Sequence, residues 1–399
     1  MTRFIHCGSF LLTSLIITLA ATGASSQSKP RARDLGVPFD GTPGPYNAIT
    51  DVKGVEVGHT TLVSGQGKLK VGEGPVRTGV TAVLPRGKNS TDDVFGAWFT
   101  LNGNGEMTGT TWLEDSGLLD GPVMITNTHS VGVVRDAVIA WKVKRGEPDM
   151  EGYWWSLPVV AETWDGFLND INGFHVKPEH VFHALDSAHG GPVEEGSVGG
   201  GTGMVCNEFK GGIGTSSRVL DVKDGGYTIG VLVQCNYGRR PELRIAGVPV
   251  GKEIPEHPAY EDETSSLRPT RGLDTGSIII VIATDAPLIP TQLKRVARRA
   301  ALGLGRNGSY SGDGSGDIFV AFSTANSGMA SPKGIHDLKM LPNDNLDPIF
   351  LATVRATEEA VVNAMVAADT MTGIDGHTAI ALPHEKLREV LKKYNRLAK

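Results

Sequence analysis

The stretch TGSIIIVIA, residues 275–283, joins a polar segment to the most hydrophobic strand-like run of the chain. A strand is predicted over residues 277–284, and two further runs, residues 227–233 and 318–322, are also hydrophobic almost throughout. Strands of this kind are typical of sheets that are buried on both faces. A sheet buried on both faces needs a layer on either side, so the runs predict a layered α/β sandwich.

Helical patterns alternate with these runs. Between residues 290 and 304, Leu293, Val296 and Ala300 recur at the spacing of one helix face, with basic residues opposite. Further helices are predicted over residues 131–143, 358–368 and 384–394. Shorter strands are predicted over residues 52–57, 79–84, 94–101 and 123–128.

Composition excludes several classes of protein. The chain has 399 residues, of which 40% are hydrophobic and 21% charged, as in globular proteins. A net charge of −6 does not favour the binding of nucleic acids, which are themselves negatively charged. A mean hydropathy of −0.10 argues against a protein with many membrane spans.

The first 26 residues have the order of a secretory signal peptide. Arg3 is followed by an apolar run over residues 10–21 and by small residues over 22–26. The run is shorter than the roughly 20 residues that span a membrane. We expect a mature, exported chain that begins near residue 27 and is periplasmic in a Gram-negative source. An uncleaved N-terminal anchor is the alternative.

The cysteines and histidines indicate no metal site. Beyond Cys7, only Cys206 and Cys235 remain, without a C-x-x-C pair. They form either one disulfide or two buried thiols, and the sequence leaves both open. The four histidines at positions 175, 180, 183 and 189 lack a clean spacing of metal ligands.

Generic catalytic motifs are absent or out of context. Residues 303–308 match G-x-G-x-x-G, but they end a predicted helix, where glycines serve as C-caps. No serine has glycine at both −2 and +2, so the nucleophile elbow of α/β-hydrolases is absent. A serine hydrolase would need another way to activate its nucleophile.

The junction Gly276-Ser277 allows two interpretations. One is a turn glycine before a strand. The other is a site of self-cleavage, which would leave Ser277 with a free α-amino group beside its own hydroxyl. Such an amine, with an ordinary pKa of about 7.7–8.0, suits a general base near neutral pH. The polar segment before it, residues 251–275, is predicted to be an exposed linker.

Ten stretches in order along the chain resemble the β-peptidyl aminopeptidases and the related L-aminopeptidase/D-esterases. Each stretch is weak alone, but the ordered set covers nearly all of the mature chain. They are residues 49–60, 78–87, 102–109, 125–132, 160–173, 199–204, 209–218, 234–238, 276–288 and 312–317.

The resemblance implies a fold and an assembly. The fold would be a four-layer αββα sandwich similar to that of N-terminal-nucleophile hydrolases. The precursor would cut itself between Gly276 and Ser277 into an α chain, residues 27–276, and a β chain, residues 277–399, with four such pairs assembling. The enzymes release N-terminal residues from short peptides and amino-acid amides without a metal or other cofactor, and the β-peptidyl branch accepts β-amino acids.

The resemblance also implies roles for five residues. Ser277 would be the nucleophile, Glu162 would bind the substrate ammonium, and Asn236 would supply the oxyanion-hole amide. Ser315 and Asp317 match a pair that orients the α-amine of the nucleophile. The β-peptidyl pattern has glutamate where this chain has Asp317, whose side chain is one methylene shorter.

Three alternatives stand beside a β-peptidyl aminopeptidase. The first is an L-aminopeptidase/D-esterase on the same scaffold. The second is a self-cleaving acyltransferase of the ornithine acetyltransferase type, which uses threonine in place of Ser277 and works in the cytoplasm. The third is a secreted binding protein that has lost activity, although Ser277, Glu162 and Asn236 are all present.

Overall fold

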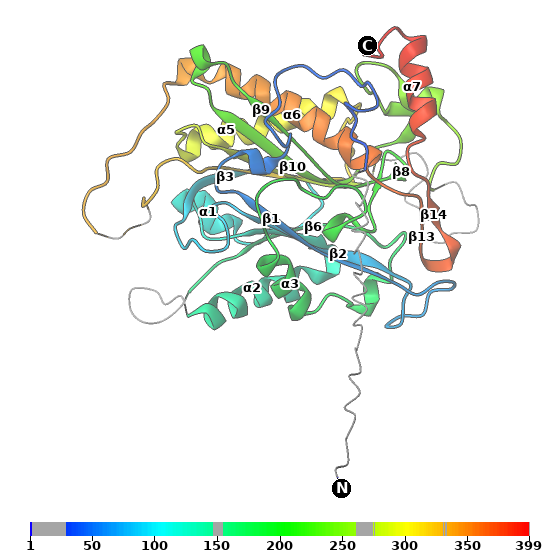
Figure 1. Cartoon of the computed structure of the whole chain (residues 1–399), viewed down its shortest axis with the longest axis horizontal. Helices are drawn as coiled ribbons and strands as arrows, with labels where there is room; N and C mark the ends of the chain where they lie inside the picture. The colour runs from blue at the N-terminus through cyan, green and yellow to red at the C-terminus, as the bar shows by residue number, and fades with distance from the viewer. Residues whose placement is uncertain are drawn as a thin grey trace.

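The computed structural model describes residue 1 and residues 29–146, 155–260, 274, 276–329, 331 and 333–398. The predicted signal peptide lies outside the described residues, apart from Met1. Within them, two stacked sheets lie between two layers of helices (Figure 1). The four-layer αββα sandwich expected from the sequence is therefore confirmed.

The larger sheet has six strands and carries the hydrophobic runs. Its central strand β11 pairs parallel with β12 and antiparallel with β10. In spatial order the strands are β4 (Leu118–Leu119), β3 (Val94–Gly103), β12 (Gly316–Ser323), β11 (Ser277–Thr284), β10 (Thr228–Asn236) and β9 (Gly212–Val219).

The smaller sheet has four strands. Its strands β5 and β6 are parallel, and the other pairs are antiparallel. In spatial order they are β1 (Glu56–Ser64), β2 (Val76–Leu84), β5 (Val123–Asn127) and β6 (Val159–Thr163). Two short pairs, β7 (Val205–Cys206) with β8 (Phe209–Lys210) and β13 (Met371–Thr372) with β14 (Thr378–Ala379), stand apart from both sheets.

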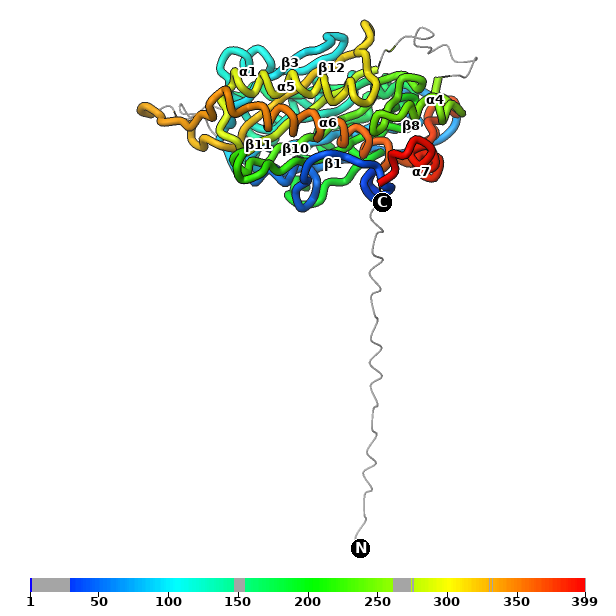
Figure 2. Tube along the Cα trace, turned by 90° about the horizontal axis from the view of Figure 1, so that it is seen from above, coloured from blue at the N-terminus to red at the C-terminus, as the bar shows by residue number. Residues whose placement is uncertain are grey.

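Two pairs of helices form the outer layers. The helices α5 (Pro290–Arg306) and α6 (Asp347–Val366) run side by side over the six-stranded sheet (Figure 2). The helices α2 (Val131–Arg145) and α3 (Pro178–Asp186) cover the four-stranded sheet (Figure 1). The remaining helices are α1 (Thr110–Ser116), α4 (Val250–Glu253) and α7 (His384–Lys393).

The alternation of side chains along β11 explains its hydrophobic run. Ile278, Ile280 and Ile282 pack in the core cluster shared with α5 and α6. Ile279, Val281 and Ala283 point the other way, into the core between the two sheets. Because successive residues of a strand face opposite sides, a strand buried on both faces needs apolar residues at every position.

Three expectations about single elements are wrong. A strand predicted over residues 52–57 begins only at Glu56, because Gly54 has a φ of +94°, in the left-handed region. The helix predicted from residue 358 begins at Asp347, with Pro348 in the first turn, where proline is tolerated. The segment 251–275 is not an exposed linker throughout, since Ile254 and Asp274 are buried.

No helix in the described part of the chain is long and apolar enough to cross a membrane.

Candidate active site

Ser277 lies where the ends of three strands meet. As the first residue of β11, it pairs with Asn236 at the end of β10 and with Gly316 at the start of β12. The Gly316 amide donates to Ser277 Oγ over 3.2 Å, and Ser277 is 6% exposed. The register of the sheet thus gives the hydroxyl a fixed place at one edge of the core.

The peptide bond before Ser277 lies closely against β10. A Cβ atom added to Gly276 would come within 2.3 Å of the Asn236 carbonyl oxygen and 2.5 Å of Tyr237 Cα. Both are main-chain atoms, which cannot rotate away as a side-chain end can. Only glycine fits at this position.

Ser315 and Asp317 form a buried pair beside the nucleophile. Ser315 Oγ donates to Asp317 Oδ1 over 2.7 Å. The other carboxylate oxygen of Asp317, Oδ2, is buried with no hydrogen-bond partner among the described residues. Burial raises the pKa of Asp317 to about 6, and the nearby Asp274 adds to the shift. The shorter aspartate therefore keeps the bond to Ser315, and no contact with Ser277 itself is part of the pair.

The Asn236 amide is held at both ends. Its Nδ2 donates to the Trp164 carbonyl oxygen over 2.9 Å, and its Oδ1 accepts from the Val205 amide over 2.8 Å. A carboxamide nitrogen carries two hydrogens, so one remains for an oxyanion beside Ser277. The group is preorganised for that task because neither end can rotate without losing a hydrogen bond.

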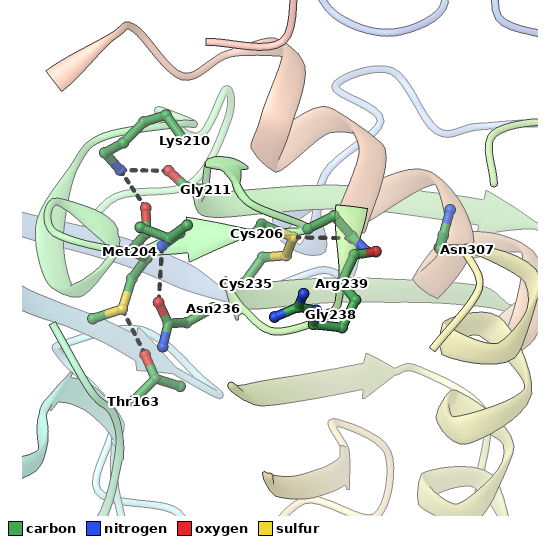
Figure 3. The surroundings of a disulfide bond; sticks show 12 residues. Thr163, Met204, Cys206, Lys210, Gly211, Cys235, Asn236, Gly238, Arg239 and Asn307 are labelled. Carbon is green, nitrogen blue, oxygen red and sulfur yellow. Dashed lines mark hydrogen bonds between the residues drawn. A yellow bond between two sulfur atoms is a disulfide. The ribbon is translucent and has the colours of Figure 1, made fainter. Parts of the chain in front are cut away.

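A disulfide supports the Asn236 amide. Cys206 and Cys235 are bonded, which settles the alternatives that the sequence left open. Cys206 follows Val205 in the chain, and Cys235 precedes Asn236. The disulfide therefore lies next to the hydrogen bond between Val205 and Asn236 (Figure 3). Closing a loop of 29 residues stabilises the folded chain by about 3–4 kcal/mol in the chain-entropy model.

Lys210, which sequence reasoning did not single out, rigidifies the same loop. Its ammonium donates to the carbonyl oxygens of Met204 (2.8 Å) and Gly211 (2.7 Å) (Figure 3). Burial lowers the pKa of Lys210 to about 7. The isolated side chain has no sequence signal, because the carbonyls that it binds are brought together only by the loop.

Glu162 faces the nucleophile from the other sheet. It lies on β6, where its Oε1 accepts from the Glu106 amide over 3.0 Å and its Oε2 accepts from the Thr128 hydroxyl. A Cβ atom on Gly105 would lie 3.3 Å from both Glu162 Oε1 and Gly316 Cα. Gly105 therefore lies next to both the Glu162 carboxylate and the strand end that holds Ser277 Oγ.

Burial also sets the chemistry of Glu162. The side chain is 4% exposed, and burial raises its pKa. Among the residues that the structure describes, no lysine or arginine forms an ion pair with it. A buried carboxylate without a lysine or arginine partner is suited to receive an ammonium group from a ligand.

The histidines that lie close together in the sequence have other partners in the structure. His175 Nε2 lies 2.8 Å from Asp170 Oδ2, whereas His180 and His183 contact Lys177 and Thr60. Over the described ranges, no three histidine, cysteine, aspartate or glutamate side chains converge as metal ligands would.

The comparisons with known proteins point to one family. The model of Peptidase family S58 matches residues 47–379. A β-peptidyl aminopeptidase, BapA of Sphingosinicella microcystinivorans, is 58% identical over an alignment of 392 residues that covers 96% of this chain and 98% of that protein.

Solved structures agree with the sequence relatives. A β-aminopeptidase of a Burkholderia species superposes with a TM-score of 0.81 at 46% identity, covering 91% of this chain and 99% of that one. The L-aminopeptidase D-Ala-esterase/amidase of Ochrobactrum anthropi gives a TM-score of 0.83 at 49% identity, covering 93% and 100%. The latter is described as a prototype of serine aminopeptidases and a new variant of the Ntn hydrolase fold.

Proposed function

The chain belongs to Peptidase family S58, and from that premise we propose that it is a β-peptidyl aminopeptidase that first cuts itself before Ser277. The observation that carries the proposal is the position of Ser277. It stands at a strand end with the Asn236 amide beside it, and Gly105 lies next to both the buried Glu162 carboxylate and Gly316, the strand partner of Ser277. Ser315 and Asp317 form a hydrogen-bonded pair beside Ser277.

Self-cleavage is an acyl shift followed by hydrolysis. Ser277 Oγ attacks the carbonyl carbon of Gly276, and the C–N bond to the Ser277 nitrogen breaks. The hydroxyl proton ends on that nitrogen, which becomes the new α-amine. Water then hydrolyses the ester, leaving a carboxylate on Gly276 and a free hydroxyl on Ser277. An amide such as Asn236 Nδ2 stabilises the oxyanion, and losing one donor of this kind costs about 2.7–4 kcal/mol.

Peptide hydrolysis reuses the same serine. Glu162 binds the ammonium of the substrate, which sets the distance to the carbonyl that Ser277 Oγ attacks. The α-amine of Ser277 takes the hydroxyl proton and passes it to the leaving amine. Ser315 and Asp317 orient the α-amine of Ser277. Water then releases the N-terminal residue from the acyl-enzyme. Since the ammonium is anchored, only the first residue of a peptide can be removed.

We further propose that the products of self-cleavage stay together as αβ pairs that assemble in fours. Strands β11 and β12 would belong to the β chain, and they lie between β3 and β10 of the α chain. Separating the chains would break the main-chain hydrogen bonds on both sides of this pair and expose the core. Export to the periplasm belongs to the same proposal and rests on the signal-like sequence of residues 1–26.

Self-cleavage is expected to slow as the pH falls through about 6, the pKa of Asp317 in the uncut chain. Protonation replaces an acceptor-only carboxylate with a neutral acid and weakens its bond to Ser315. The measurement is the rate of cutting of freshly synthesised chain across this pH range. Asp317→Asn should remove this loss of rate at low pH. Asp313→Asn, which replaces an exposed aspartate nearby, should keep it. If Asp317→Asn loses rate at low pH as the wild type does, the titrating group is not Asp317.

The substrate class is tested with matched amides. The purified enzyme is expected to hydrolyse β-alanyl-p-nitroanilide with a higher kcat/KM than L-alanyl-p-nitroanilide. The two acyl groups place the ammonium at different distances from the carbonyl, and a single anchor at Glu162 favours one of them. The reverse preference would favour an L-aminopeptidase/D-esterase, and no turnover of either amide would favour a binding protein.

A further inference from the structure

A buried aspartate lies just before the peptide bond that the chain is proposed to cut. Asp274 is 2% exposed. Its Oδ1 accepts from the amide of Gly276 over 3.3 Å and from the amide of Gly238 over 3.1 Å. One carboxylate oxygen therefore ties the residue that supplies the attacked carbonyl to the chain that follows β10.

The main chain of Asp274 is also held. Its amide donates to the hydroxyl of Tyr310 over 3.2 Å. A Cβ atom on Gly312 would come within 2.6 Å of the Asp274 carbonyl oxygen and 2.8 Å of its Cβ, so this loop packs directly on the aspartate. The same loop continues to Ser315 and Asp317, which links the hold on Asp274 to the buried pair beside Ser277.

The second oxygen of the Asp274 carboxylate has no polar partner. Oδ2 is buried, with no hydrogen-bond partner among the described residues. Asp274 also adds to the raised pKa values of Asp317 on β12, Tyr237 after β10 and Tyr260 after α4, although burial is the main cause of each. Burying a carboxylate oxygen without a hydrogen bond costs stability, and such a cost is common at functional sites.

We propose that Asp274 is a positioning residue for self-cleavage. By accepting the Gly276 N–H, it holds the orientation of Gly276 and presents the carbonyl of this residue to Ser277 Oγ. The proposal rests on the self-cleavage put forward above and assigns its geometry to one side chain. Since a displacement of about 1 Å can cost a factor of 10² in rate, loss of this hydrogen bond should be visible as slow cutting.

The test compares two replacements of similar size in the full chain. The chain is made by cell-free synthesis, and the cut fraction is followed by intact mass. Asp274→Asn keeps an oxygen that can accept from Gly276 and Gly238, so it should cut at close to the normal rate. Asp274→Leu removes the acceptor and should cut about 10- to 100-fold more slowly. Asp313→Asn, an exposed acid on the neighbouring loop, should cut normally.

A second measurement separates positioning from folding. Each Asp274 replacement is also made together with Ser277→Ala, so that only uncut chain is present, and its Tm is compared with that of Ser277→Ala alone. We expect slow cutting by Asp274→Leu without a matching loss of Tm. Normal cutting by Asp274→Leu, equally slow cutting by both replacements, or a parallel fall in Tm would each overturn the proposal. A wild-type chain that stays uncut would instead overturn the proposed function.

Discussion

Ser277→Ala is expected to leave the chain uncut and to abolish peptidase activity. The alanine has no oxygen to attack Gly276, and without cleavage no α-amine forms at position 277 to act as a base. Removing a serine nucleophile costs on the order of 10⁶ in kcat. Because one atom, Ser277 Oγ, serves both reactions, the two losses should occur together.

Intact mass and N-terminal sequencing measure this result. The wild type should give two fragments, the smaller beginning Ser-Ile-Ile-Ile, and Ser277→Ala should give one. Ser277→Cys retains a nucleophile and should still be cut, whereas Ser187→Ala, on the exposed surface of the chain, serves as the matched control. Cleavage of Ser277→Ala at the same bond, or peptidase activity in an uncut chain, would contradict the mechanism.

Glu162→Gln is expected to lower kcat/KM for amide substrates by about 10²- to 10⁴-fold while self-cleavage continues. The replacement keeps the shape of the side chain but removes the charge that binds the substrate ammonium, and a buried ion pair that loses one partner loses about 3–5 kcal/mol. Self-cleavage involves no substrate ammonium, so the uncut chain does not need this charge. A loss of peptidase activity without a loss of self-cleavage is expected only if Glu162 binds the substrate ammonium.

The neighbouring Glu106 provides the control for this experiment. Its side chain is exposed, and only its main-chain amide contacts Glu162. Glu106→Gln should therefore keep a nearly normal kcat/KM in the same assay with β-alanyl-p-nitroanilide. Equal losses in both replacements would point to a general field effect, and normal activity of Glu162→Gln would remove Glu162 from the substrate site.

Most of the layered fold was predictable, because its signals are local. The run over residues 277–284 is β11 with the same bounds. The helix predicted over residues 290–304 is α5, which ends slightly later, at Arg306. The errors came where a local signal was weak. The amphipathic pattern does not mark the start of α6 at Asp347, and the polar residues around Asp274 suggested exposure to solvent, whereas Asp274 is buried.

The sequence by itself determined the hydrophobic strands and the chemistry available at Gly276-Ser277, since both depend on neighbouring residues. A glycine before a serine, followed by an apolar strand, can be recognised without knowing what packs against it. The family resemblance added the roles of Glu162, Asn236, Ser315 and Asp317, but not their positions in space.

Only the tertiary structure decided which groups meet at Ser277. The register of β10, β11 and β12 brings Asn236 and Gly316 beside the serine, and the stacking of the second sheet brings Glu162 across from it. The bond between Cys206 and Cys235 and the burial of Asp274 follow from the same packing. Strand order and register join residues far apart in the chain, and local propensity carries no information about such contacts.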